Sequence, residues 1–491
     1  MYVGIDLGTS GVKAVVIDDD QRVVAEKSSR PLEVSRPHRG WSEQDPDTWW
    51  DAVAEAMDGL KADAPAALAA VRGIGLSGQM YGATLLDRAD RPIRPAILWN
   101  DTRTARECRI LEERAPDVVS IAGRRPTPGT TATKLMWLKD AEPDAFDRVE
   151  TVLLPKDYVR LKLTGDKASD KADSSGTLWM DVAARDWSDR LLAASGMERR
   201  QMPALYEGTE ATGRLRPALA ERWGMAVPPV VAAGGGDNAC GACGTGLVRP
   251  GDGTVSLGTS GVLFVATDAA RPSPDHAIET LCHAVPDVWH HMSVVLSATA
   301  SLNWLAKLLR RPAADLIRAL GPAPRPATAL LFLPFLDGCW SPQADADVRG
   351  AFVGLSHGTG EEEMTAAVLQ GVVFSFLEAA DAFRANGLGF DRLLGIGGGS
   401  RSDLWLSMVA TALGVTVAVP TASELGAAFG AARLGLIAAT GAPPLDVLTQ
   451  PAIAREVAPT AAHAAGYRAA FEAWHALYAP VRAASAALAR T

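Results

Sequence analysis

Six residues of the chain occur twice without change: Leu7-Gly8-Thr9-Ser10-Gly11-Val12 returns as Leu257-Gly258-Thr259-Ser260-Gly261-Val262. Each copy lies between two short apolar stretches, which predicts a strand, a tight turn and a second strand. Glycine on both sides of Thr-Ser permits positive φ and lets main-chain N–H groups point into the bend. Such donors, with two hydroxyls, suit a phosphate oxygen. One copy alone is typical of an ordinary glycine-rich hairpin, but two identical copies favour two phosphate-binding turns in two related domains.

A carboxylate follows another glycine-rich stretch. Residues 228–233 predict a short apolar strand that runs into Gly234-Gly235-Gly236-Asp237-Asn238. Glycines at a strand end let a ligand approach the backbone closely, and a carboxylate at that point can accept its proton. We therefore predict that Asp237 is catalytic. Asp237 can also cap the helix expected from Asn238 onward, and both roles can hold at once.

Two further apolar strands are predicted to end in polar residues. Residues 71–76 lead into Ser77-Gly78-Gln79-Met80-Tyr81-Gly82, and residues 94–99 lead into Asn100-Asp101-Thr102-Arg103. Ligands gather at the carboxyl ends of strands in open α/β sheets, so both endings are candidate ligand sites. A plain strand-to-helix turn is the alternative for each ending, and for Met80 and Tyr81 the two interpretations are equally supported.

A strand expected at residues 393–397 runs into Gly397-Gly398-Gly399-Ser400-Arg401-Ser402. This run could let an adenine or a ribose lie on the main chain, although many strand-to-helix turns have the same composition. Cys240 and Cys243 have the spacing of a redox motif, but small residues surround them, which favours close helix packing.

The elements that must position these residues follow a plan that occurs twice. Strands are expected at 2–7, 12–17 and 22–28, and a helix begins at Asp45-Pro46, where Asp45 suits the N-cap. After a Pro/Gly hinge at 248–253 the plan repeats, with a helix at about 297–309. A small-residue helix begins at Glu424-Leu425-Gly426, and the tail from about residue 452 is Ala-rich and predicted to be helical, without chemistry.

Length and composition limit the possible functions. The 491 residues predict two or three domains, and 48% hydrophobic with 21% charged residues is typical of a globular protein. A net charge of −9 argues against a broad nucleic-acid-binding face. The N-terminus has no basic region, so no signal peptide is expected, and no apolar segment is predicted to span a bilayer. Five cysteines fit a reducing, cytoplasmic setting.

Taken in order, these segments resemble the FGGY family of carbohydrate kinases. The resemblance covers nearly the whole chain, through residues 1–17, 41–50, 78–82, 97–103, 154–158, 234–238, 256–261 and 397–402. Gly350-Ala351-Phe352-Val353-Gly354-Leu355, followed by residues 364–370, also resembles the family's C-terminal signature. Within the family, the chain is most similar to kinases that act on D-xylulose.

The resemblance implies an α/β fold of two actin-like domains of the ribonuclease H type, with ATP and a sugar in the cleft between them. We expect a sugar-binding domain at 1–247, a nucleotide-binding domain at 248–440 and a helical tail at 441–491. The implied reaction is phosphorylation of a ketopentose, D-xylulose first, with ATP and Mg²⁺. The expected partner is a small-molecule sugar, without nucleic acid or membrane, and a homodimer stays open.

Individual roles come from the same resemblance. Asp237 would be the general base on a sugar hydroxyl, and Asp6 would organise Mg²⁺ indirectly, through Mg-ATP. The sugar would contact Gln79, Met80, Tyr81, Trp99, Asn100, Asp101, Asp237 and Asn238. The nucleotide would contact Gly8, Thr9, Ser10, Gly11, Lys13, Gly258, Thr259, Ser260, Gly261, Gly398, Gly399 and Ser400.

The chain departs from the D-xylulose kinases of the family at two places. They usually have a histidine at the position of Tyr81, and a Gly-Glu-Arg run where this chain has Gly338-Cys339-Trp340. The first departure lies at the sugar, and the second removes two charges near the cleft. Another ketose, such as D-ribulose, therefore stays open as the substrate.

Three other classes of protein fit the sequence less well. An actin- or chaperone-like ATPase would share the repeated turns but would not need residues 78–82. A ribonuclease H-type nuclease needs clustered carboxylates and a basic groove, against which the acidic balance argues. A sugar sensor without catalysis would not need both Asp6 and Asp237.

Overall fold

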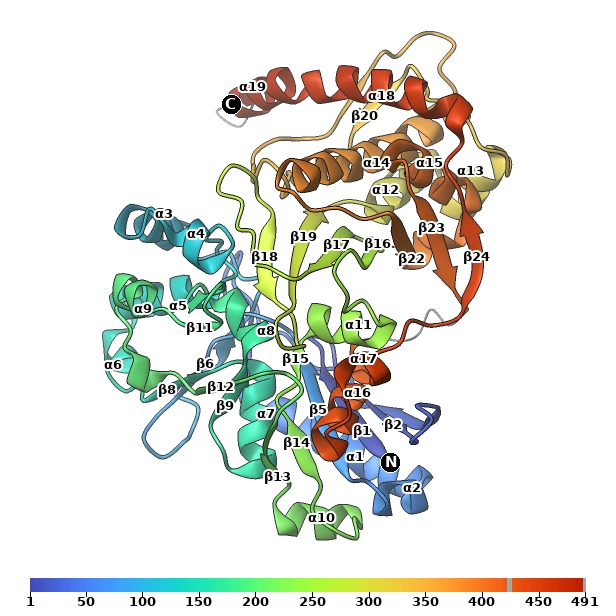
Figure 1. Ribbon diagram of the computed structural model, residues 1–491. Coiled ribbons are helices and arrows are strands. Elements are labelled where there is room, and N and C mark those ends of the chain that lie inside the picture. Colours follow the sequence, from blue (N-terminus) through green and yellow to red (C-terminus); the bar gives the residue numbers. More distant parts are fainter. Residues whose placement is uncertain (422–425, 489–491) are drawn as a thin grey trace.

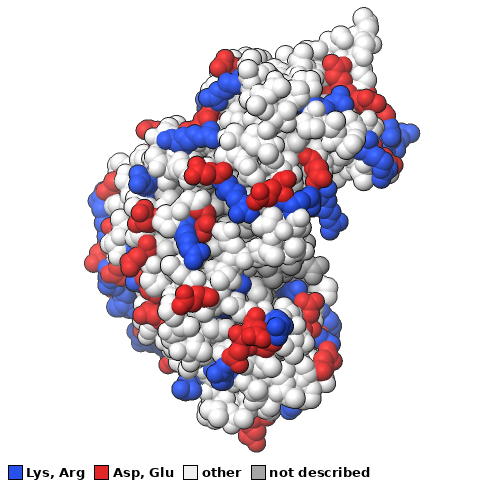
Figure 2. All heavy atoms as spheres, turned by 45° about the vertical axis from the view of Figure 1, so that its right-hand side comes forward, with Lys and Arg blue, Asp and Glu red and all other residues white. Residues whose placement is uncertain are grey.

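The computed structural model describes residues 1–421 and 426–488. Two seven-stranded sheets lie one above the other, with helices between them and on both outer sides (Figure 1). The surface is hollowed between the two lobes, and on this face basic and acidic side chains are mixed (Figure 2). The fold is therefore the predicted α/β arrangement of two related units around a cleft.

The first sheet is built on the hairpin that contains the first repeated turn. Its order is β13-β14-β5-β1-β2-β3, with β15 paired to β5 beside β14. Strands β1 and β2 are antiparallel, whereas β5 runs parallel to β1. The strands are β1 (Tyr2–Leu7), β2 (Val12–Ile17), β3 (Val23–Ser28), β5 (Gly73–Gly78), β13 (Ala211–Arg214), β14 (Val230–Ala232) and β15 (Gly235–Gly236).

The second sheet repeats this plan around the second turn. Its order is β18-β19-β17-β16-β22-β23-β24, and the antiparallel hairpin β16–β17 is followed by the parallel neighbours β22 and β23. The strands are β16 (Gly253–Leu257), β17 (Gly261–Thr267), β18 (Glu279–Cys282), β19 (Trp289–Val295), β22 (Arg392–Ile396), β23 (Thr416–Pro420) and β24 (Ile453–Val457). The repeated sequence thus marks a repeated architecture.

Helices cover both faces of each sheet because the strands are apolar on both sides. Helices α1 (Pro46–Asp63), α7 (Pro155–Thr164) and α10 (Pro217–Trp223) cover the outer face of the first sheet. Helices α11 (Asp237–Thr245) and α16 (Ala427–Thr440) lie between the sheets. The outer face of the second sheet carries α12 (Thr299–Leu309), α13 (Ala313–Ala319), α14 (Glu361–Ala385), α15 (Asp403–Leu413) and α18 (Ala461–Ala476).

Helix α1 begins as its sequence predicts. Asp45 is the N-cap and accepts a hydrogen bond from the backbone N–H of Asp47 at 3.0 Å, and Pro46 is the first helical residue. Trp49, at helical spacing from the next apolar residues, is fully buried. The cap and the apolar face together fix where this helix starts and which side meets the sheet.

Helix α16 comes from the second half of the chain but packs directly on the first sheet. A Cβ at Gly4 of β1 would lie 1.8 Å from the Ala428 carbonyl oxygen, and one at Gly75 of β5 would lie 1.8 Å from that of Ala431. Only glycine allows this approach. On its other side α16 meets α11, where Cys240 and Cys243 are buried free thiols, so helix packing explains these cysteines.

A group of short elements extends from the first half beside the cleft, at the left of Figure 1. Their common core also takes in Cys282 and Trp289 from β18 and β19, so it joins the two halves. The group contains β6 (Thr84–Leu86), β8 (Thr151–Leu153), β10 (Met180–Asp181), β11 (Asp186–Trp187), α3 (Ala105–Arg114), α4 (Val118–Ala122), α5 (Thr131–Ala141), α6 (Pro143–Phe146) and α9 (Asp189–Ser195).

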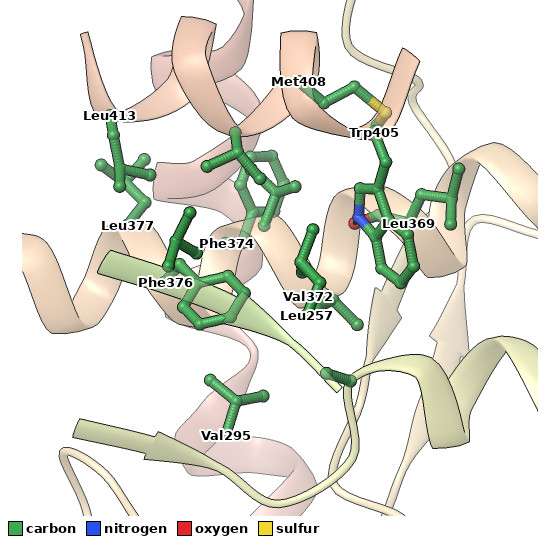
Figure 3. Packing of buried hydrophobic residues seen from close by; sticks show 14 of the residues in the cluster. Leu257, Val295, Leu369, Val372, Phe374, Phe376, Leu377, Trp405, Met408 and Leu413 are labelled. Atoms are coloured by element: carbon green, nitrogen blue, oxygen red, sulfur yellow. Dashed lines mark hydrogen bonds between the residues drawn. The ribbon is translucent and has the colours of Figure 1, made fainter. Parts of the chain in front are cut away.

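The core of the second half is centred on α14. Its apolar side chains lie between α15 and the strands β16 and β19 (Figure 3). Among the described residues, α14 is the one helix long and apolar enough to cross a membrane, with a mean hydropathy of 1.4. No uninterrupted apolar segment was expected to span a bilayer, and 94% of the apolar window of α14 is buried inside the protein. The hydropathy of α14 therefore reflects its place in the core.

Two predicted elements differ from the structure. Residues 94–99 form only the two-residue β7 (Ala96–Ile97), which pairs with β4 (Glu43–Gln44) outside both large sheets. The tail is not entirely helical, because Ile453–Val457 forms the edge strand β24 before α18 and α19 (Tyr478–Leu488). The predicted helix start at Glu424-Leu425 lies outside the described residues, and α16 is described from Ala427. The division at 247 and 440 stays a prediction.

Candidate active site

Strand register brings two carboxylates together at one edge of the first sheet. Asp6 of β1 lies opposite Ser77 of β5, and Ser77 in turn lies opposite Gly235 of β15. The next row ends in Gly236, so Asp237 begins α11 directly beyond the carboxyl end of the sheet. Gly236, not Asp237, is the N-cap of this helix, which corrects the capping role predicted for the carboxylate.

The bend before Asp237 depends on Gly234. This residue has φ of +75°, and a Cβ there would lie 1.9 Å from the carbonyl oxygen of Leu76. Both the left-handed backbone and the contact with β5 require glycine. The bend turns the chain from β14 into β15 and so sets the position of Asp237.

The pKa values of both carboxylates are raised in the folded protein. Burial in the protein and the neighbouring Asp6 raise the pKa of Asp237 to about 7, against the opposing hydrogen bond from the Asn238 backbone N–H. The side chain is nevertheless exposed to the cleft, so a ligand can reach it. Burial also raises the pKa of Asp6, although Ser77 Oγ donates to its Oδ1 at 2.8 Å and Lys13 is a nearby cation. A carboxylate with a pKa near 7 suits a general base.

Asp237 lies in a cavity of about 570 Å³ between the two halves of the molecule. Its walls are largely apolar with a few polar groups, as in small-molecule sites. The first half contributes Met80, Tyr81, Trp99, Asn100, Asp101, Arg124 and Asn238, and the second contributes Ser260, Val262, Glu279, Met292, Val294, Leu296 and Trp340. Of the eight residues predicted to contact a sugar, only Gln79 is absent from this lining.

One end of the cavity holds a buried ion pair that the sequence did not reveal. Arg124 Nη2 lies 2.9 Å from Glu279 Oε1, and both side chains are almost fully buried. The Arg124 guanidinium stacks on the Tyr81 ring, with its carbon 4.5 Å from the ring centre. Nε and Nη1 of Arg124 and Oε2 of Glu279 have no hydrogen-bond partner among the residues that the structure describes. Two donors and one acceptor therefore remain for a polar ligand.

Tyr81 adopts a backbone conformation that is uncommon for a non-glycine residue. Its φ is +65°, and its carbonyl oxygen accepts hydrogen bonds from Lys134 Nζ at 2.7 Å and Thr131 Oγ1 at 3.1 Å. These two donors hold the strained backbone in place. Such strain persists where the surroundings enforce it, and it is concentrated at functional sites.

The predicted sugar-binding residues on the neighbouring segments differ in how available they are. Asn100 Oδ1 is buried without a partner and can accept a hydrogen bond from a ligand. The Asp101 carboxylate is occupied by the Ser42 backbone N–H at 2.6 Å and by the Arg103 guanidinium. Gln79 lies behind the wall, where its Oε1 accepts from Thr9 Oγ1 at 2.8 Å. It therefore supports the first turn.

The second repeated turn lines the cavity, and the first contacts a residue of its wall. Trp99 Nε1 donates to Thr9 Oγ1 of the first turn at 2.9 Å, while Ser260 of the second turn lies in the cavity wall. None of the four flanking glycines has positive φ, so that part of the prediction was wrong. The turns are instead closed by hydrogen bonds, such as Gly8 N–H to the Gly11 carbonyl at 3.0 Å. Lys13 follows the first turn, and its Nζ lies 3.0 Å from Glu26.

The third glycine run adjoins the second turn. Gly397 has φ of +84°, and a Cβ there would lie 2.8 Å from the Leu257 carbonyl. Gly398 and Ser400 line a separate pocket of about 430 Å³ together with Gly397, Arg401, Val419, Pro420 and Arg455. Gly399 lies behind them against Leu257 and Trp405. The run therefore lies where it can contact the part of a ligand that extends beyond the second turn.

The donor set beside the first turn fits a hard divalent cation. Among the residues that the structure describes, no three His, Cys, Asp or Glu side chains form a metal cluster. Mg²⁺ needs no such cluster, because it commonly takes one or two carboxylates and completes its shell with water and phosphate oxygens. Asp6 accepts from Ser77 through Oδ1, and its Oδ2 accepts no hydrogen bond within the described part of the chain. Asp6, with Asp237 nearby, therefore fits Mg²⁺ carried by a nucleotide.

Arg124 and Glu279 could not have been found from the sequence. They are 155 positions apart, neither belongs to a recognisable motif, and each follows an unremarkable segment. Their pairing depends on a backbone contact between the halves, where the Thr280 N–H donates to the Gly123 carbonyl at 2.7 Å. The departure at Gly338-Cys339-Trp340 did point to the cavity, since Trp340 lies in its wall.

Comparison with known proteins gives matches along the whole chain. Residues 1–244 match the N-terminal domain of the FGGY family of carbohydrate kinases, and residues 253–439 match its C-terminal domain. The xylulose kinase of Escherichia coli (strain K12) is 46% identical over 482 residues, which cover 97% of this chain and 98% of that protein.

Solved structures give the same result. The crystal structure of a xyloylose kinase from Brucella ovis has a TM-score of 0.96 and 49% sequence identity, over 98% of this chain and 99% of that one. The xylulose kinase from Rhodospirillum rubrum has a TM-score of 0.91 and 28% identity, over 99% of both chains. Both comparisons span the two lobes and the cavity between them.

Proposed function

The chain belongs to the FGGY family of carbohydrate kinases, and from this premise we propose that it transfers the γ-phosphoryl group of ATP to D-xylulose, giving D-xylulose 5-phosphate. The observation that carries the proposal is the position of Asp237, exposed in a cavity that the second repeated turn lines and whose wall residue Trp99 contacts the first turn. The choice of sugar rests on the relatives named xylulose kinase. Asp237 is the base in this proposal, and the cavity is the sugar site.

The chemical step needs positioning and charge stabilisation more than covalent help from the protein. The sugar oxygen attacks the γ-phosphorus, the bond from that phosphorus to the bridging oxygen of ADP breaks, and the hydroxyl proton passes to the Asp237 carboxylate. Backbone N–H groups of the two turns, with Thr9 and Ser260, are placed to contact phosphate oxygens. With the sugar bound, the apolar walls exclude water, which otherwise competes as the acceptor.

The proposed metal role belongs to Asp6. Asp6 would hold Mg²⁺ through the nucleotide, and the ion would neutralise charge on the β- and γ-phosphates. Ser77 keeps the Asp6 carboxylate in one orientation. Replacing Asp6 by Ala should weaken activity and raise the Mg²⁺ concentration needed for half-maximal rate. Equal activity and an equal Mg²⁺ requirement in that variant would remove Asp6 from the mechanism.

Sugar recognition in this proposal uses the groups that lack partners. Asn100 Oδ1 and Glu279 Oε2 would accept hydrogen bonds from sugar hydroxyls, and Arg124 would donate to a hydroxyl or carbonyl oxygen. Met80 and Trp340 would pack against the carbon face. A ketopentose has hydroxyls along its length and a carbonyl, which matches this alternation of donors, acceptors and apolar contacts.

A coupled ADP assay with a panel of pentuloses and hexuloses tests the proposal. We expect D-xylulose to give the highest kcat/KM, and we expect Asp237→Asn to lose almost all turnover while ATP still binds, because the amide keeps the shape and cannot accept the proton. A panel in which no ketose stimulates ATP turnover would reject the function. Near-normal turnover in Asp237→Asn would reject the role of Asp237. The cytoplasmic setting and a homodimer stay predictions, the latter open to light scattering.

A further inference from the structure

The C-terminal helices hold a loop that forms part of the sugar-site wall. Residues 336–350 contain no strand of a large sheet and run between β20 (Leu331–Leu333) and β21 (Ala351–Val353). The loop brings Trp340 into the cavity that contains Asp237. Its base is a short pairing in which Cys339 and Asp345 exchange backbone hydrogen bonds of 2.8 and 2.7 Å. Asp345 therefore helps to position Trp340, together with Ser341, whose Oγ donates to the Ala277 carbonyl at 2.6 Å and accepts from the Val294 N–H at 3.2 Å.

Asp345 is fixed from outside the loop by α19. Its Oδ2 accepts a hydrogen bond from Tyr478 Oη at 2.9 Å and lies 2.9 Å from Nε of Arg482. Its Oδ1 accepts from the backbone N–H groups of Asp347 and Val348. The Asp345 side chain is only 10% exposed. One carboxylate therefore ties the loop to itself with one oxygen and to the C-terminal helix with the other.

Two further contacts join the loop to α19 and to α14. The Arg349 backbone N–H donates to Ser485 Oγ of α19 at 3.0 Å. Gln343 Nε2 donates to Glu378 Oε1 of α14 at 2.6 Å, and His475 of α18 lies 2.7 Å from the same oxygen. The loop is therefore held on one side by α14 and α19, and His475 of α18 contacts the Glu378 carboxylate that holds Gln343. Figure 1 shows α18 and α19 lying across α14 on the outer side of the second half.

The far side of the loop is not packed. Pro342 and Gln343 line a second cavity of about 560 Å³, together with His475, Tyr478 and Arg482. The loop therefore separates this outer cavity from the sugar cavity of about 570 Å³. Cys339 and Val348 of the loop pack into the core of the second half, whereas Pro342 and Gln343 border the outer cavity, so the contacts of the loop with neighbouring elements hold this part in place.

We infer that the C-terminal helices are part of the sugar-recognition apparatus: α19, through Tyr478 and Arg482, positions the loop that places Trp340 against the sugar. This inference rests on the proposed function for its substrate. Tyr478 and Arg482 are positioning residues, since they lie outside the cavity and act through Asp345. Loss of both anchors should raise KM for D-xylulose about tenfold, as expected for a misplaced contact in a substrate pocket. KM for ATP should stay within about twofold.

The experiment compares Tyr478→Phe, Arg482→Ala and their double variant with Arg468→Ala. Arg468 is the matched control, because its pair with Asp381 joins α18 to α14 without touching the loop. Hydrogen exchange of peptides covering residues 336–350 should become faster in the double variant and stay unchanged in the control. Arg482→Lys, which keeps the charge, should restore part of the sugar affinity. Unchanged exchange together with unchanged KM for the sugar would overturn the inference.

A double-mutant cycle with Trp340→Ala separates positioning from general destabilisation. If α19 acts through Trp340, the double anchor variant should raise KM for the sugar in the natural background and have little further effect in Trp340→Ala. Full additivity of the two effects would also overturn the inference. If the natural protein phosphorylates no ketose, the proposed function fails, while the exchange measurement still decides whether α19 holds the loop. A double variant that does not fold is replaced by Tyr478→Phe, which removes one hydroxyl.

Discussion

At the scale of single residues, the site is governed by two carboxylates placed close together. Asp6 contributes to the raised pKa of Asp237, so the ionised pair is under repulsion in the free protein. The arrangement favours a proton acceptor, because a carboxylate with a pKa of about 7 binds a proton more tightly than an ordinary one. It also means that the catalytic arrangement opposes folding at neutral pH.

Asp237→Asn should therefore be more stable than the natural protein at pH 8. The folded pKa of Asp237 lies above its unfolded value, so its contribution to stability is fully present below about pH 4 and is lost as the pH rises through about 7. Thermal unfolding at pH 5 and pH 8 measures this, and the gain should be larger at pH 8. The same titration predicts that kcat/KM of the natural protein falls as the pH drops below about 7. An equal gain in stability from Asp237→Asn at pH 5 and at pH 8 would contradict the repulsion between the carboxylates.

Tyr81→His should shift substrate preference toward D-xylulose. The phenol ring fills space beside Gly176, where a Cβ would lie 2.1 Å from Tyr81 Cε1, and it stacks on Arg124. A smaller imidazole changes both the room and the polar atom presented to the sugar. One matched buried hydrogen bond changes specificity by about tenfold to a hundredfold. The ratio of kcat/KM for D-xylulose and D-ribulose, measured on both proteins at saturating ATP, tests this. An unchanged ratio would leave Trp99 and Asn100 as the specificity residues.

At the scale of elements, very close backbone packing joins β1 and β5 to α16. A side chain at Gly75 would occupy the position of the Ala431 carbonyl oxygen, so the strand and helix would have to separate. We expect Gly75→Ala to cost about 1–3 kcal/mol or more in the free energy of unfolding. Gly466→Ala is the control substitution, because Gly466 lies inside α18 and an added Cβ there would meet open space. The free energy of unfolding of that variant should rise by about 1 kcal/mol. Denaturant unfolding measures both, and equal effects would contradict the packing argument.

Strand β19 and the residues before it carry three buried histidines. Burial lowers the pKa of His283 to about 3 and that of His291 to about 4, and it lowers the pKa of His290 further, helped by its histidine neighbours. His283 Nε2 and both ring nitrogens of His290 have no hydrogen-bond partner among the described residues. These rings are neutral in the fold and become charged on unfolding below about pH 6.5. Stability therefore decreases as the pH falls from about 6.5 toward 4.

His290→Phe should remove part of this acid sensitivity. The His290 ring stacks on Phe264 with centres 4.8 Å apart, so phenylalanine keeps the contact. Each such histidine contributes up to about 1.4 kcal/mol of lost stability per pH unit below its unfolded pKa. Thermal midpoints between pH 5 and 8 measure the slope, with His357→Phe at an exposed position as the control. Identical slopes in the natural protein and His290→Phe would contradict the assignment.

Local patterns predicted most of the elements and much of the site. Capping at Asp45, the repeated turns and the glycine runs give signals within a few residues, and each was found where expected. The prediction of a full strand at residues 94–99 was wrong, because an apolar run of that length is equally compatible with an extended segment outside the main sheet. Arg124, Glu279 and the loop anchors Tyr478 and Arg482 are positioned by contacts between distant segments. Such contacts leave no local pattern that a single sequence could reveal.

At the scale of the whole molecule, β18 joins the two halves on the side of the sugar cavity. The Arg124–Glu279 pair is the charged part of this junction, and Cys282 N–H donates to Ser175 Oγ at 3.2 Å beside it. The junction makes the cavity a shared property of both halves, so neither half alone forms the sugar site. The pair then has two tasks, to join the halves and to recognise a ligand.

Changing one or both members of the pair separates these tasks. Glu279→Ala leaves a buried guanidinium without its partner and should cost about 3–5 kcal/mol of stability. The double change Arg124→Met with Glu279→Leu removes both charges and should recover most of that loss. Sugar affinity should stay low in the double variant if the pair recognises the ligand. Denaturant unfolding measures stability, and KM for the ketose measures sugar affinity. If both recover in the double variant, the pair only joins the two halves and does not recognise the ligand.

The place of α16 also determines when the protein can finish folding during its synthesis. Residues 427–440 cover a face of the first sheet, yet they are translated after nearly nine-tenths of the chain. At about 5–20 residues per second, the strands β1 and β5 leave the ribosome about 20 to 80 seconds before the helix that covers them. Throughout that interval α16 does not yet cover the backbone at Gly4 and Gly75 or the apolar side chains beside it. The nascent first half is therefore the form of this protein that most needs a chaperone, although its strands are the first to be made.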